Sequence, residues 1–510
     1  MKSVKIIFIL IFMYLMNGNL IAQSSHDTHQ TSDSEKTSET VHGEEDSQHS
    51  KDDGEHHSLH LDGSTVNLFW IIPFIGILLS IAVLPLIAPH FWHQHYGKVS
   101  LFWGSLFIIL FGAYYGTSMA AFYLAEVYLG EFIPFIVLLL TLFTVAGGVQ
   151  LTGTLRGSPI VNTLLLLIGT VLASWMGTTG AAMLLIRPII RANAWRNKKV
   201  HIIVFFIFLV ANIGGALTPL GDPPLFLGFL KGVSFFWTTT HMLMPMIFVS
   251  VILLVLFFFL DSYFYRKEGT PPDDGVREPL GMKGKANLLL LPLVVGAVLI
   301  SGIWHPDATN PDDWAIYAWG TCLMTKGVFA QVGLLLIITI VSWKITPASV
   351  RHGNGFTWEP ILEVGKLFAT IFITMVPPIA ILRAGSDGAL KFIIDMVKNP
   401  TTGEYVNSMF FWATGILSSF LDNAPTYVVF FNTAGGDANI LMNTFPGTLL
   451  AISAGAVFMG ANTYIGNAPN FMVKSIAEEN KIDMPSFFGY MVWSVAILVP
   501  IFIITTFIFF

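Results

Sequence analysis

Two aspartates stand inside long apolar stretches of this 510-residue chain. Asp222 lies among glycines and prolines in ANIGGALTPLGDPPL (residues 211–225), and Asp422 lies in FLDNAPTYVVFF (residues 420–431). A carboxylate at the centre of a bilayer costs about 2.5 to 3.5 kcal/mol or more, so it is a candidate functional group. Burial favours the protonated form of a carboxylic acid, while the ionised form attracts a cation. Such a group can therefore exchange a proton for a metal ion near neutral pH.

Side chains with neutral oxygen atoms accompany both aspartates. Hard cations prefer oxygen ligands, and carboxylates, hydroxyls, amides and free backbone carbonyls supply them. We predict that Asp222, Asp422 and Asn423 hold Na⁺. The other predicted residues that bind the ion or substrate are Gly177, Thr178, Thr179, Thr218, Thr426, Asn462, Thr463 and Asn467.

Membrane helices must position these residues. The chain is 54% hydrophobic and 11% charged, and its apolar runs repeatedly exceed the roughly 18 residues needed to cross a bilayer. The pattern predicts an all-α polytopic membrane protein with about ten transmembrane helices. We expect the crossings at residues 66–89, 100–123, 132–153, 201–230, 242–261, 286–304, 322–343, 367–384, 446–473 and 486–510.

Two further apolar stretches do not fit as ordinary crossings. Residues 159–190 are too long for one helix and too short for two crossings, and residues 408–432 have the same form. We predict that both are re-entrant hairpins, with tips at residues 177–180 and 422–426. A non-helical tip at membrane depth is tolerated only where protein or a water-filled cavity satisfies its backbone.

The basic residues predict the orientation of the helices. Loops with an excess of Lys and Arg face the cytoplasm, and here they are every second loop. The first hairpin then enters from the cytoplasm and the second from the periplasm, and the C-terminus is periplasmic. We expect a multi-pass protein of a bacterial inner membrane. The basic loops contain Lys98, Arg156, residues 191–199, 266–285 and 344–366, and Lys474 with Lys481.

An internal repeat relates the two hairpins and two of the crossings. Adding 245 to a residue number places Gly177 on Asp422 and Thr178 on Asn423. The same offset superposes GALTPLGDPPLF (residues 215–226) on GANTYIGNAPNF (residues 460–471). The matches are mostly Gly, Thr and Pro, whereas chance matches between apolar helices usually involve Leu, Ile and Val. We therefore predict two repeats, at about residues 66–261 and 286–510.

The charge pattern gives the two repeats opposite orientations. Inverted repeats that each contain a hairpin and a broken helix are typical of secondary transporters with a site near the bilayer midplane. Each break leaves free carbonyls and positive helix N-termini, where a small ion can bind. The predicted helix-breaking residues are Gly215, Gly221, Pro223, Gly460, Gly466 and Pro469.

Two segments precede the first crossing. Residues 1–23 have two lysines before an apolar run, which is typical of a cleaved signal peptide, and an uncleaved anchor is the alternative. Residues 24–65 are rich in His, Asp, Glu and Ser, so we expect a disordered periplasmic segment. Its histidines leave metal capture open as an alternative. The predicted transporter domain is residues 66–510.

Several classes of protein are not expected. The single cysteine, Cys322, excludes an internal disulfide framework, four-thiolate clusters and the usual structural zinc sites. The sequence contains no His-Glu-x-x-His or Gly-x-Ser-x-Gly motif, so an enzyme is not expected. We expect no cofactor and no nucleic-acid partner; the expected partners are the lipid bilayer and a small transported ion.

At these motifs the sequence resembles the ion transporter superfamily, which includes divalent-anion/sodium symporters, arsenite and citrate-transporter-like carriers, and NhaD-type sodium/proton antiporters. SWMGTTGAAMLL (residues 174–185) is similar to the first hairpin of the symporters, and FLDNAPTYVVFF is similar to a hairpin of the antiporters and arsenite carriers. NIGGALTPLGDPP and GANTYIGNAPN are similar to the unwound helices. The resemblance implies a scaffold domain, a moving transport domain, elevator-type alternating access and a homodimer. The first hairpin departs from the pattern, because it lacks both the Ser-Asn-Thr sequence of the symporters and an Asp-Asn pair.

The transported species has alternatives. An ionised Asp222 would repel a carboxylate substrate, which would need hydroxyls, amides or an arginine. Arg187 and Arg383 lie towards helix ends, where arginines commonly reach the interface. His201 and His241 either sense pH or are ordinary interfacial histidines, and the second interpretation is the simpler one. We predict a Na⁺/H⁺ antiporter that transports Na⁺ and H⁺; Na⁺- or H⁺-coupled transport of a carboxylate such as citrate, or arsenite-type anion transport, is the alternative.

Overall fold

The computed structural model describes residues 60–269, 278–304, 315–318 and 321–510. The chain divides into two units, Met1–His57 and Ser58–Phe510, and every described residue belongs to the second. The predicted signal segment and most of the predicted disordered segment lie outside the described residues. Its end is described, and the backbone N–H of Leu61 donates to the Tyr123 hydroxyl at 2.7 Å. Leu61, which precedes the predicted start of the transporter domain at residue 66, is thus held against α4.

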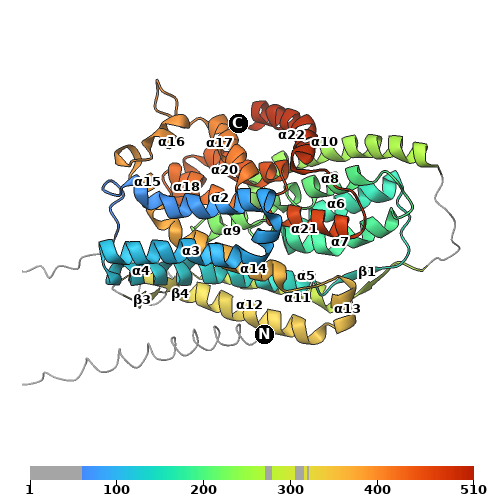
Figure 1. Cartoon of the computed structure of the whole chain (residues 1–510), viewed down its shortest axis with the longest axis horizontal. Helices are drawn as coiled ribbons and strands as arrows, with labels where there is room; N and C mark the ends of the chain where they lie inside the picture. Colours follow the sequence, from blue (N-terminus) through green and yellow to red (C-terminus); the bar gives the residue numbers. More distant parts are fainter. Residues whose placement is uncertain (1–59, 270–277, 305–314, 319–320) are drawn as a thin grey trace, which may run out of the picture. The chain divides into compact units, whose positions relative to one another are not determined.

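Helices make up most of the described chain (Figure 1). Within it, nine helical runs are long and apolar enough to cross a membrane, or ten if a pair bent by 42°, Glu359–Thr374 with Val376–Arg383, is one crossing. The prediction of an all-α polytopic membrane protein is confirmed, with nine or ten candidate crossings against the predicted ten. Pro159–Met176, half of the first predicted hairpin, is one of the nine, and residues 446–473 are not among them, so the re-entrant course of the two helical hairpins stays a prediction. The nine runs are Leu68–Ile87, Pro89–Tyr115, Thr117–Ala146, Pro159–Met176, Val200–Leu217, Trp237–Glu268, Ala286–Ile303, Lys326–Ile345 and Phe487–Phe509.

The helices of the first part of the chain run as far as Glu268. They are η1 (Leu68–Ile71), α2 (Ile72–Ile87), α3 (Pro89–Tyr115), α4 (Thr117–Val127), the π-helical turn η2 (Tyr128–Phe132), α5 (Ile133–Ala146), α6 (Pro159–Met176), α7 (Thr178–Ala192), α8 (Val200–Leu209), η3 (Ile213–Leu217), α9 (Pro223–Leu230) and α10 (Trp237–Glu268).

The helices of the second part begin at Ala286. They are α11 (Ala286–Ile303), α12 (Lys326–Ile345), α13 (Ala348–Gly353), α14 (Glu359–Thr374), α15 (Val376–Arg383), η5 (Gly385–Asp387), α16 (Lys391–Met396), α17 (Asn407–Phe420), α18 (Asn423–Thr433), α19 (Ala438–Asn443), α20 (Pro446–Met459), η6 (Gly460–Asn462), α21 (Ala468–Glu479) and α22 (Phe487–Phe509).

Two short β-ribbons shift the limits of two predicted crossings. β1 (Gln150–Thr152) pairs with β2 (Gly281–Lys283), and β3 (Ala315–Ala318) pairs with β4 (Thr321–Thr325), both antiparallel. The crossing predicted at residues 132–153 therefore ends at Ala146, where two glycines follow. The crossing predicted at residues 322–343 starts later, because Thr325 caps α12 by accepting from the N–H of Val328 at 3.1 Å.

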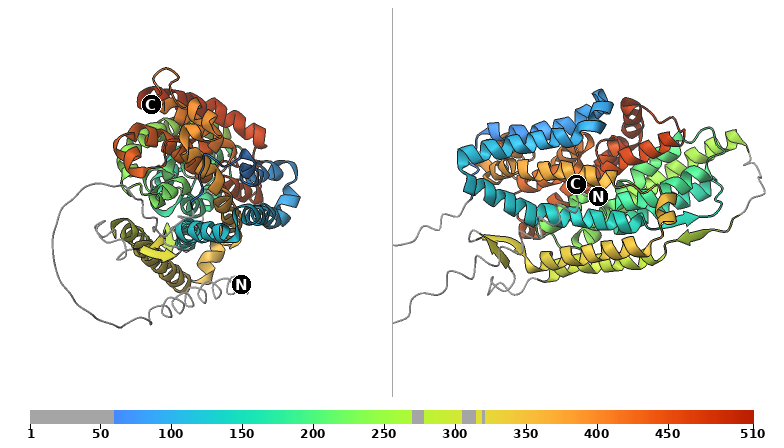
Figure 2. Two further views of the ribbon diagram at one scale, coloured as in Figure 1. Left: turned by 90° about the vertical axis from the view of Figure 1, so that its left-hand side faces the viewer. Right: turned by 60° about the horizontal axis from the view of Figure 1, so that its bottom comes forward.

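The helices pack in two groups. In the first group, α3 packs on α2, α4 and α14, and the pair α11–α12 lies along α5 at one edge of the bundle (Figures 1 and 2). In the second group, α6 packs on α7, η3 and α10, and α17 packs on α18 and α20. The groups touch where α5 contacts α7 and where α15 contacts α18.

The two broken helices belong to the interior of the second group. The first consists of α8, η3 and α9, and the second of α20, η6 and α21. In the run Val200–Leu217, 89% of the most apolar window is buried, against 22% to 56% for the other eight runs. Since a helix in contact with lipid leaves much of its surface exposed, α8 is a core helix, not a peripheral one.

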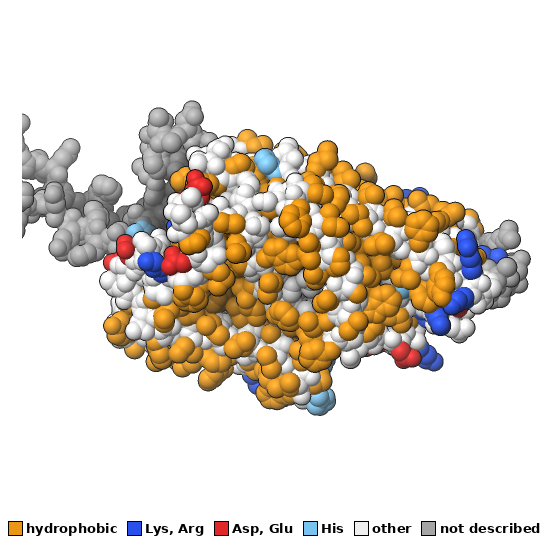
Figure 3. All heavy atoms as spheres, turned by 90° about the horizontal axis from the view of Figure 1, so that it is seen from above, with side chains coloured by type: hydrophobic (Ala, Val, Ile, Leu, Met, Phe, Trp, Pro, Cys, Tyr) orange, Lys and Arg blue, Asp and Glu red, His pale blue; other side chains and the backbone are white. Residues whose placement is uncertain are grey.

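Charged side chains gather at the ends of the helices. In Figure 3 hydrophobic side chains cover the middle of the molecule, and Lys and Arg cluster at the end on the right of the view. Arg191, Lys198, Arg266 and Lys267 are exposed near the ends of α7 and α10. These residues belong to the loops that the charge pattern predicts to be cytoplasmic.

A buried ion pair lies close to this basic end. Asp261 of α10 is 2.6 Å from Nη1 of Arg196 and 2.8 Å from Nε2 of His201, and all three side chains are at most 2% exposed. Asn162 of α6 donates to the second oxygen of Asp261 at 2.9 Å. His201 is therefore buried against a carboxylate, a partner that the interpretation as an ordinary interfacial histidine did not include. The cluster ties α6, α8 and α10 together.

Candidate functional site

Each hairpin is attached to the broken helix of its own repeat by serine and threonine side chains. Thr218 donates to the backbone carbonyl of Ser174 in the first repeat, and Thr463 donates to that of Ser419 in the second. The Ser174 hydroxyl donates to the carbonyl of Gly214, and the Ser419 hydroxyl donates to that of Met459. Every one of these atoms has its counterpart 245 residues away.

The breaks in the two helices also correspond. A Cβ atom on Gly221 would collide with the carbonyl oxygen of Gly215, and a Cβ atom on Gly466 would collide with that of Gly460. Only glycine allows the backbone to fold back so closely on itself. After the breaks, α9 starts at Pro223, and α21 starts with a proline in its first turn, a position that suits the fixed φ of proline.

Asp222 is the centre of a hydrogen-bonded cluster that joins the two repeats. Its carboxylate accepts from Asn423 Nδ2 at 2.7 Å, from Asn467 Nδ2 at 3.0 Å and from Thr178 Oγ1 at 3.4 Å. All four side chains are buried, and Asp222 is 1% exposed. Among the described residues, no Lys, Arg or His bonds to Asp222. The offset of 245 relates Asp222 to Asn467 and Thr178 to Asn423, so equivalent positions meet here.

Four helices begin at this cluster. Asp222 and Asn467 are the N-cap residues of α9 and α21, and Thr178 and Asn423 are the first residues of α7 and α18. A helix N-terminus carries a partial positive charge of roughly half an elementary charge. Four such ends favour negative charge at one point, which offsets part of the cost of an ionised Asp222 in the interior.

Asp422 lies at the tip of the second hairpin and is half-buried. Its side chain accepts from the backbone N–H of Ala424 at 3.1 Å and thereby caps α18, and its carbonyl accepts from the Thr426 hydroxyl at 3.0 Å. The equivalent position in the first hairpin is Gly177, whose φ of 80° suits glycine. Asp422 does not bond directly to Asp222, although its charge acts on it.

The other predicted site residues lie around this centre and do not bond to Asp222. The hydroxyls of Thr218 and Thr463 are used to hold the hairpins. Asn462 Nδ2 donates to the Ser419 hydroxyl at 2.9 Å. Thr179 is half-buried beside Thr178 and has no hydrogen bond in the described part of the chain. Their part in ion binding stays a prediction.

Two asparagines next to the cluster were missed in the sequence. Asn212, the N-cap residue of η3, donates to Asn470 Oδ1 of α21 at 2.7 Å, and both residues are 0% exposed. Asn467 Nδ2 reaches Asn212 Oδ1 at 3.3 Å as well as Asp222. Both lie within the glycine-rich and proline-rich motifs, where a buried polar side chain is the signal that could have found them.

One oxygen atom of the cluster lacks a partner. Asn423 Oδ1 is buried and has no hydrogen bond among the described residues, although Nδ2 of the same amide donates to Asp222. Asn462 Oδ1 is also buried and has no hydrogen bond among the described residues. A buried polar atom without a partner is costly, so such an oxygen indicates a place where a ligand can bind.

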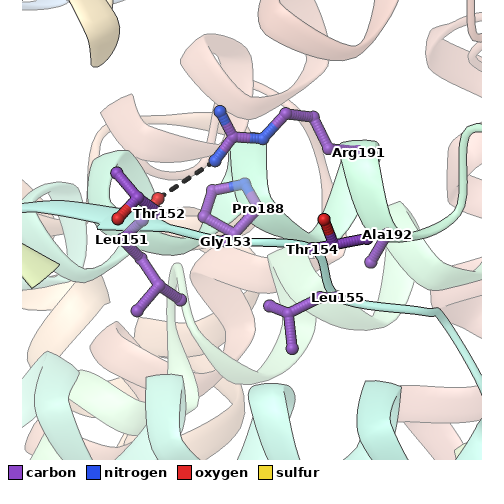
Figure 4. A pocket seen from close by; sticks show the side chains of 8 residues that line it. All are labelled: Leu151, Thr152, Gly153, Thr154, Leu155, Pro188, Arg191 and Ala192. Atoms are coloured by element: carbon purple, nitrogen blue, oxygen red, sulfur yellow. Dashed lines mark hydrogen bonds between the residues drawn. The ribbon is translucent and has the colours of Figure 1, made fainter. Parts of the chain in front are cut away.

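The pocket in Figure 4 lies elsewhere. It has a volume of about 190 Å³ and is formed by residues 151–155 around β1 together with Pro188, Arg191 and Ala192 at the end of α7. Arg191 Nη2 donates to the Leu151 carbonyl at 3.0 Å beside it. None of the predicted site residues lines this pocket.

The fold and the cluster define a multi-pass α-helical membrane protein whose polar centre is shared by two related halves. Residues 63–510 match the family described as "Putative citrate transport" (CitMHS_2), and the chain belongs to that family. It is therefore a citrate-transporter-like ion transporter, of the secondary transporter class. No curated protein matches the chain.

Proposed function

We propose that the protein exchanges Na⁺ for H⁺ across a bacterial inner membrane and that Asp222 binds the two ions in turn. The observation that carries this proposal is the buried Asp222 carboxylate, bonded only to neutral side chains from both repeats. A carboxylate in a low-dielectric site binds a proton readily, and it attracts a cation once that proton has left. Because the two ions compete for one group, binding of either releases the other.

Asn423 supports a cation next to this carboxylate. Its Oδ1 has no described hydrogen bond, and an ion bound beside it would satisfy that oxygen. Asp422 precedes it in the chain and brings a second carboxylate to the same place. An ion site made by Asp222, Asp422 and Asn423 offers the oxygen ligands that hard cations prefer.

We further propose that the second helix group carries the ion and that the first group is a fixed scaffold, in a homodimer. All four residues of the cluster belong to α7, α18 and the two broken helices, which pack within the second group. Lys231 at the end of α9 and Glu131 of η2 form an ion pair of 2.8 Å between the groups. This pair would break when the second group moves. The reaction is transport alone, without chemical change of a substrate.

Transport of citrate is the second candidate function, since the family description names citrate. The four helix N-termini at the cluster attract negative charge and would suit a carboxylate substrate. Against this function, Asp222 already places a negative charge there and would repel a citrate carboxylate while ionised. A citrate carrier built on this cluster would need Asp222 to hold a proton or a cation whenever citrate binds.

Purified protein in proteoliposomes separates the two functions. With a pH-sensitive dye inside the vesicles, an imposed Na⁺ gradient should drive proton movement in the opposite direction. Uptake of labelled citrate, measured with the same gradient, should not exceed that of protein-free vesicles. The Asp222→Asn variant is the matched control for the dye signal. Na⁺-driven citrate uptake without any proton exchange would contradict the proposal and favour the second candidate.

A further inference from the structure

A chain of asparagine side chains leads from the backbone of the second repeat towards Asp222. Its far end is Asn470, whose Nδ2 donates to the carbonyls of Gly460 and Thr463, both at 2.9 Å. These two bonds use both N–H groups of the amide. Asn470 must therefore present its oxygen to the next residue, and this oxygen accepts from Asn212 Nδ2 at 2.7 Å.

The middle of the chain is fixed in the same way. Asn212 Nδ2 donates both to Asn470 and to the carbonyl of Ile207, the latter at 2.8 Å. Its own oxygen is thereby turned towards Asn467, which donates to it from Nδ2 at 3.3 Å. The same Nδ2 also faces the carbonyl of Ala211 at 3.2 Å. The two N–H groups of Asn467 are therefore shared among three acceptors, the Ala211 carbonyl, Asn212 Oδ1 and the Asp222 carboxylate, of which Asp222 is the nearest at 3.0 Å. With acceptors on this side only, the amide keeps its NH₂ group towards Asp222.

We propose that Asn212 and Asn470 are positioning residues that lock the side-chain amide of Asn467 as a hydrogen-bond donor to Asp222. Asn467 then keeps its NH₂ group towards Asp222 throughout the cycle, which stabilises the carboxylate when it is ionised, and it does not offer its oxygen to the ion. Asn423 differs, because its NH₂ group has one described acceptor, Asp222, whereas that of Asn467 has three. The buried oxygen of Asn423 has no described partner. Asn423 is the amide that turns to bind the cation. This inference rests on the proposed function only in assigning ion exchange to Asp222.

The positions that the internal repeat relates to Asn212 and Asn470 do not carry asparagines. The offset of 245 relates Asn212 to Val457 and Asn470 to Leu225, and these two residues are also buried, at 0% and 1% exposure. The surrounding fold therefore accepts an apolar pair at corresponding positions. The buried polar pair Asn212 and Asn470 therefore occurs beside Asn467, the donor to Asp222, and not at the equivalent positions.

Few other charges act on Asp222. Asp422 at the start of α18 is the titratable group that faces it. The charged residues on α7, α9 and α21 are several residues further along those helices: the first are Arg187, Lys231 and Lys474, which lie roughly 10 Å or more along the helix axis. Lys231 and Lys474 are paired, with Glu131 and Glu478. A change in proton binding by Asp222 therefore reports on its own hydrogen bonds and on Asp422.

Infrared titration of the full-length protein in lipid tests the proposal. The band of the protonated carboxyl group that disappears in Asp222→Asn is followed as a function of pH. In the double variant Asn212→Val, Asn470→Leu, which copies the residues of the equivalent positions, the midpoint should move by about one pH unit towards alkaline pH, because the ionised form has lost a fixed donor. At constant pH, about tenfold more Na⁺ should be needed to remove the band.

A thermodynamic cycle separates positioning from mere packing. Asn467→Ala should shift the midpoint by at least as much, and adding the double variant to it should produce no further shift. The matched control is Asn287→Leu, another buried and hydrogen-bonded asparagine, located in α11; it should lower stability without moving the midpoint. If the double variant does not fold, Asn470→Ser is titrated in its place.

An unchanged pH midpoint of the carboxyl band in a folded Asn212 or Asn470 variant would overturn the proposal. A shift in these variants that is additive with the shift caused by Asn467→Ala would overturn it as well. Because the band reports proton binding and not transport, this result is independent of the transported ion. Absence of Na⁺-driven proton movement by the wild-type protein would contradict the proposed function alone.

Discussion

The two repeats hold their hairpins identically but place different groups at the site. Thr218 and Thr463 make the same bond to Ser174 and Ser419, across 44 residues in each repeat. At the centre, however, the first repeat supplies a carboxylate, Asp222, where the second supplies an amide, Asn467. The bonds that shape the backbone thus correspond between the two repeats, while the groups at the centre of the cluster differ.

The two aspartates of the site also differ in the bonds that their side chains make. Both are N-cap residues, Asp222 of α9 and Asp422 of α18. Asp422 uses its side chain to accept from the backbone N–H of Ala424, whereas Asp222 makes no capping bond and is held by side chains alone. The Asp422 carboxylate is therefore already used as a hydrogen-bond acceptor at the N-terminus of α18. The Asp222 carboxylate makes no such capping bond, and under the proposed function it is the group that binds a proton or a cation.

The largest effect is expected from a change that gives the two repeats the same residue at the equivalent positions 222 and 467. Asp222→Asn gives both repeats an asparagine, and it should reduce Na⁺-driven proton exchange by about 100-fold or more, since the charged ligand is lost. The protein should remain folded, because asparagine is nearly the same size and its amide oxygen can still accept from Asn467. Proteoliposome assays and size-exclusion chromatography measure the two outcomes. Substantial exchange by this variant would exclude Asp222 as the exchanging group.

A swap variant tests whether the two positions are interchangeable. Asp222→Asn combined with Asn467→Asp moves the carboxylate to the equivalent place in the other repeat. We expect exchange to stay as low as in the single variant, because the carboxylate would then face the oxygen of Asn212, which is fixed by its neighbours. Recovery of exchange to within about tenfold of wild type would show that only the presence of one carboxylate matters.

A smaller effect is expected at the second aspartate. Asp422→Asn keeps a good capping side chain for α18 but removes its charge, so the Na⁺ concentration for half-maximal exchange should rise by about tenfold with little loss of stability. The matched control is Asp437→Asn, because Asp437 caps α19 through the N–H of Ile440 and lies outside the cluster. An unaltered Na⁺ dependence in Asp422→Asn would remove Asp422 from the ion site.

The smallest effect concerns the shared framework. Thr218→Val and Thr463→Val each leave one hairpin carbonyl without its donor, so each should lower the free energy of unfolding by about 1 to 3 kcal/mol. The two losses should be similar, since both hydroxyls donate the same bond, with the larger loss for Thr463, whose hydroxyl also accepts from the N–H of Gly466. Thermal unfolding of the purified variants in detergent gives the comparison. A loss confined to one variant would mean that the two repeats are not held alike.

Much of the fold could be predicted from hydropathy and from the repeated motifs. The count of about ten crossings and the breaks near Gly221 and Gly466 depend on local sequence, and the structure contains both. The limits of the crossings at residues 132–153 and 322–343 were wrong, because apolar residues there form β1 and β4. Hydropathy does not distinguish a short apolar strand from the end of a helix.

The site could be predicted in composition but not in its bonds. Thr178, Asp222, Asn423 and Asn467 were all expected at the site, and the structure brings these four together. Which hydroxyls hold the hairpins and which face Asp222 does not follow from residue type, since a threonine can serve either purpose. The buried role of His201 was missed for a similar reason, as its partner Asp261 lies 60 residues away.

The sequence by itself determined that the chain is apolar enough to enter a membrane, that it is duplicated, and that each half contains a helix interrupted by glycine and proline. These properties depend on residues close together in the chain. Only the tertiary structure decided that Asp222 meets Asn423 and Asn467, which are 201 and 245 residues away. A hydrogen bond requires its two heavy atoms to be about 3 Å apart, and over such separations that distance is set by the packing of one half against the other.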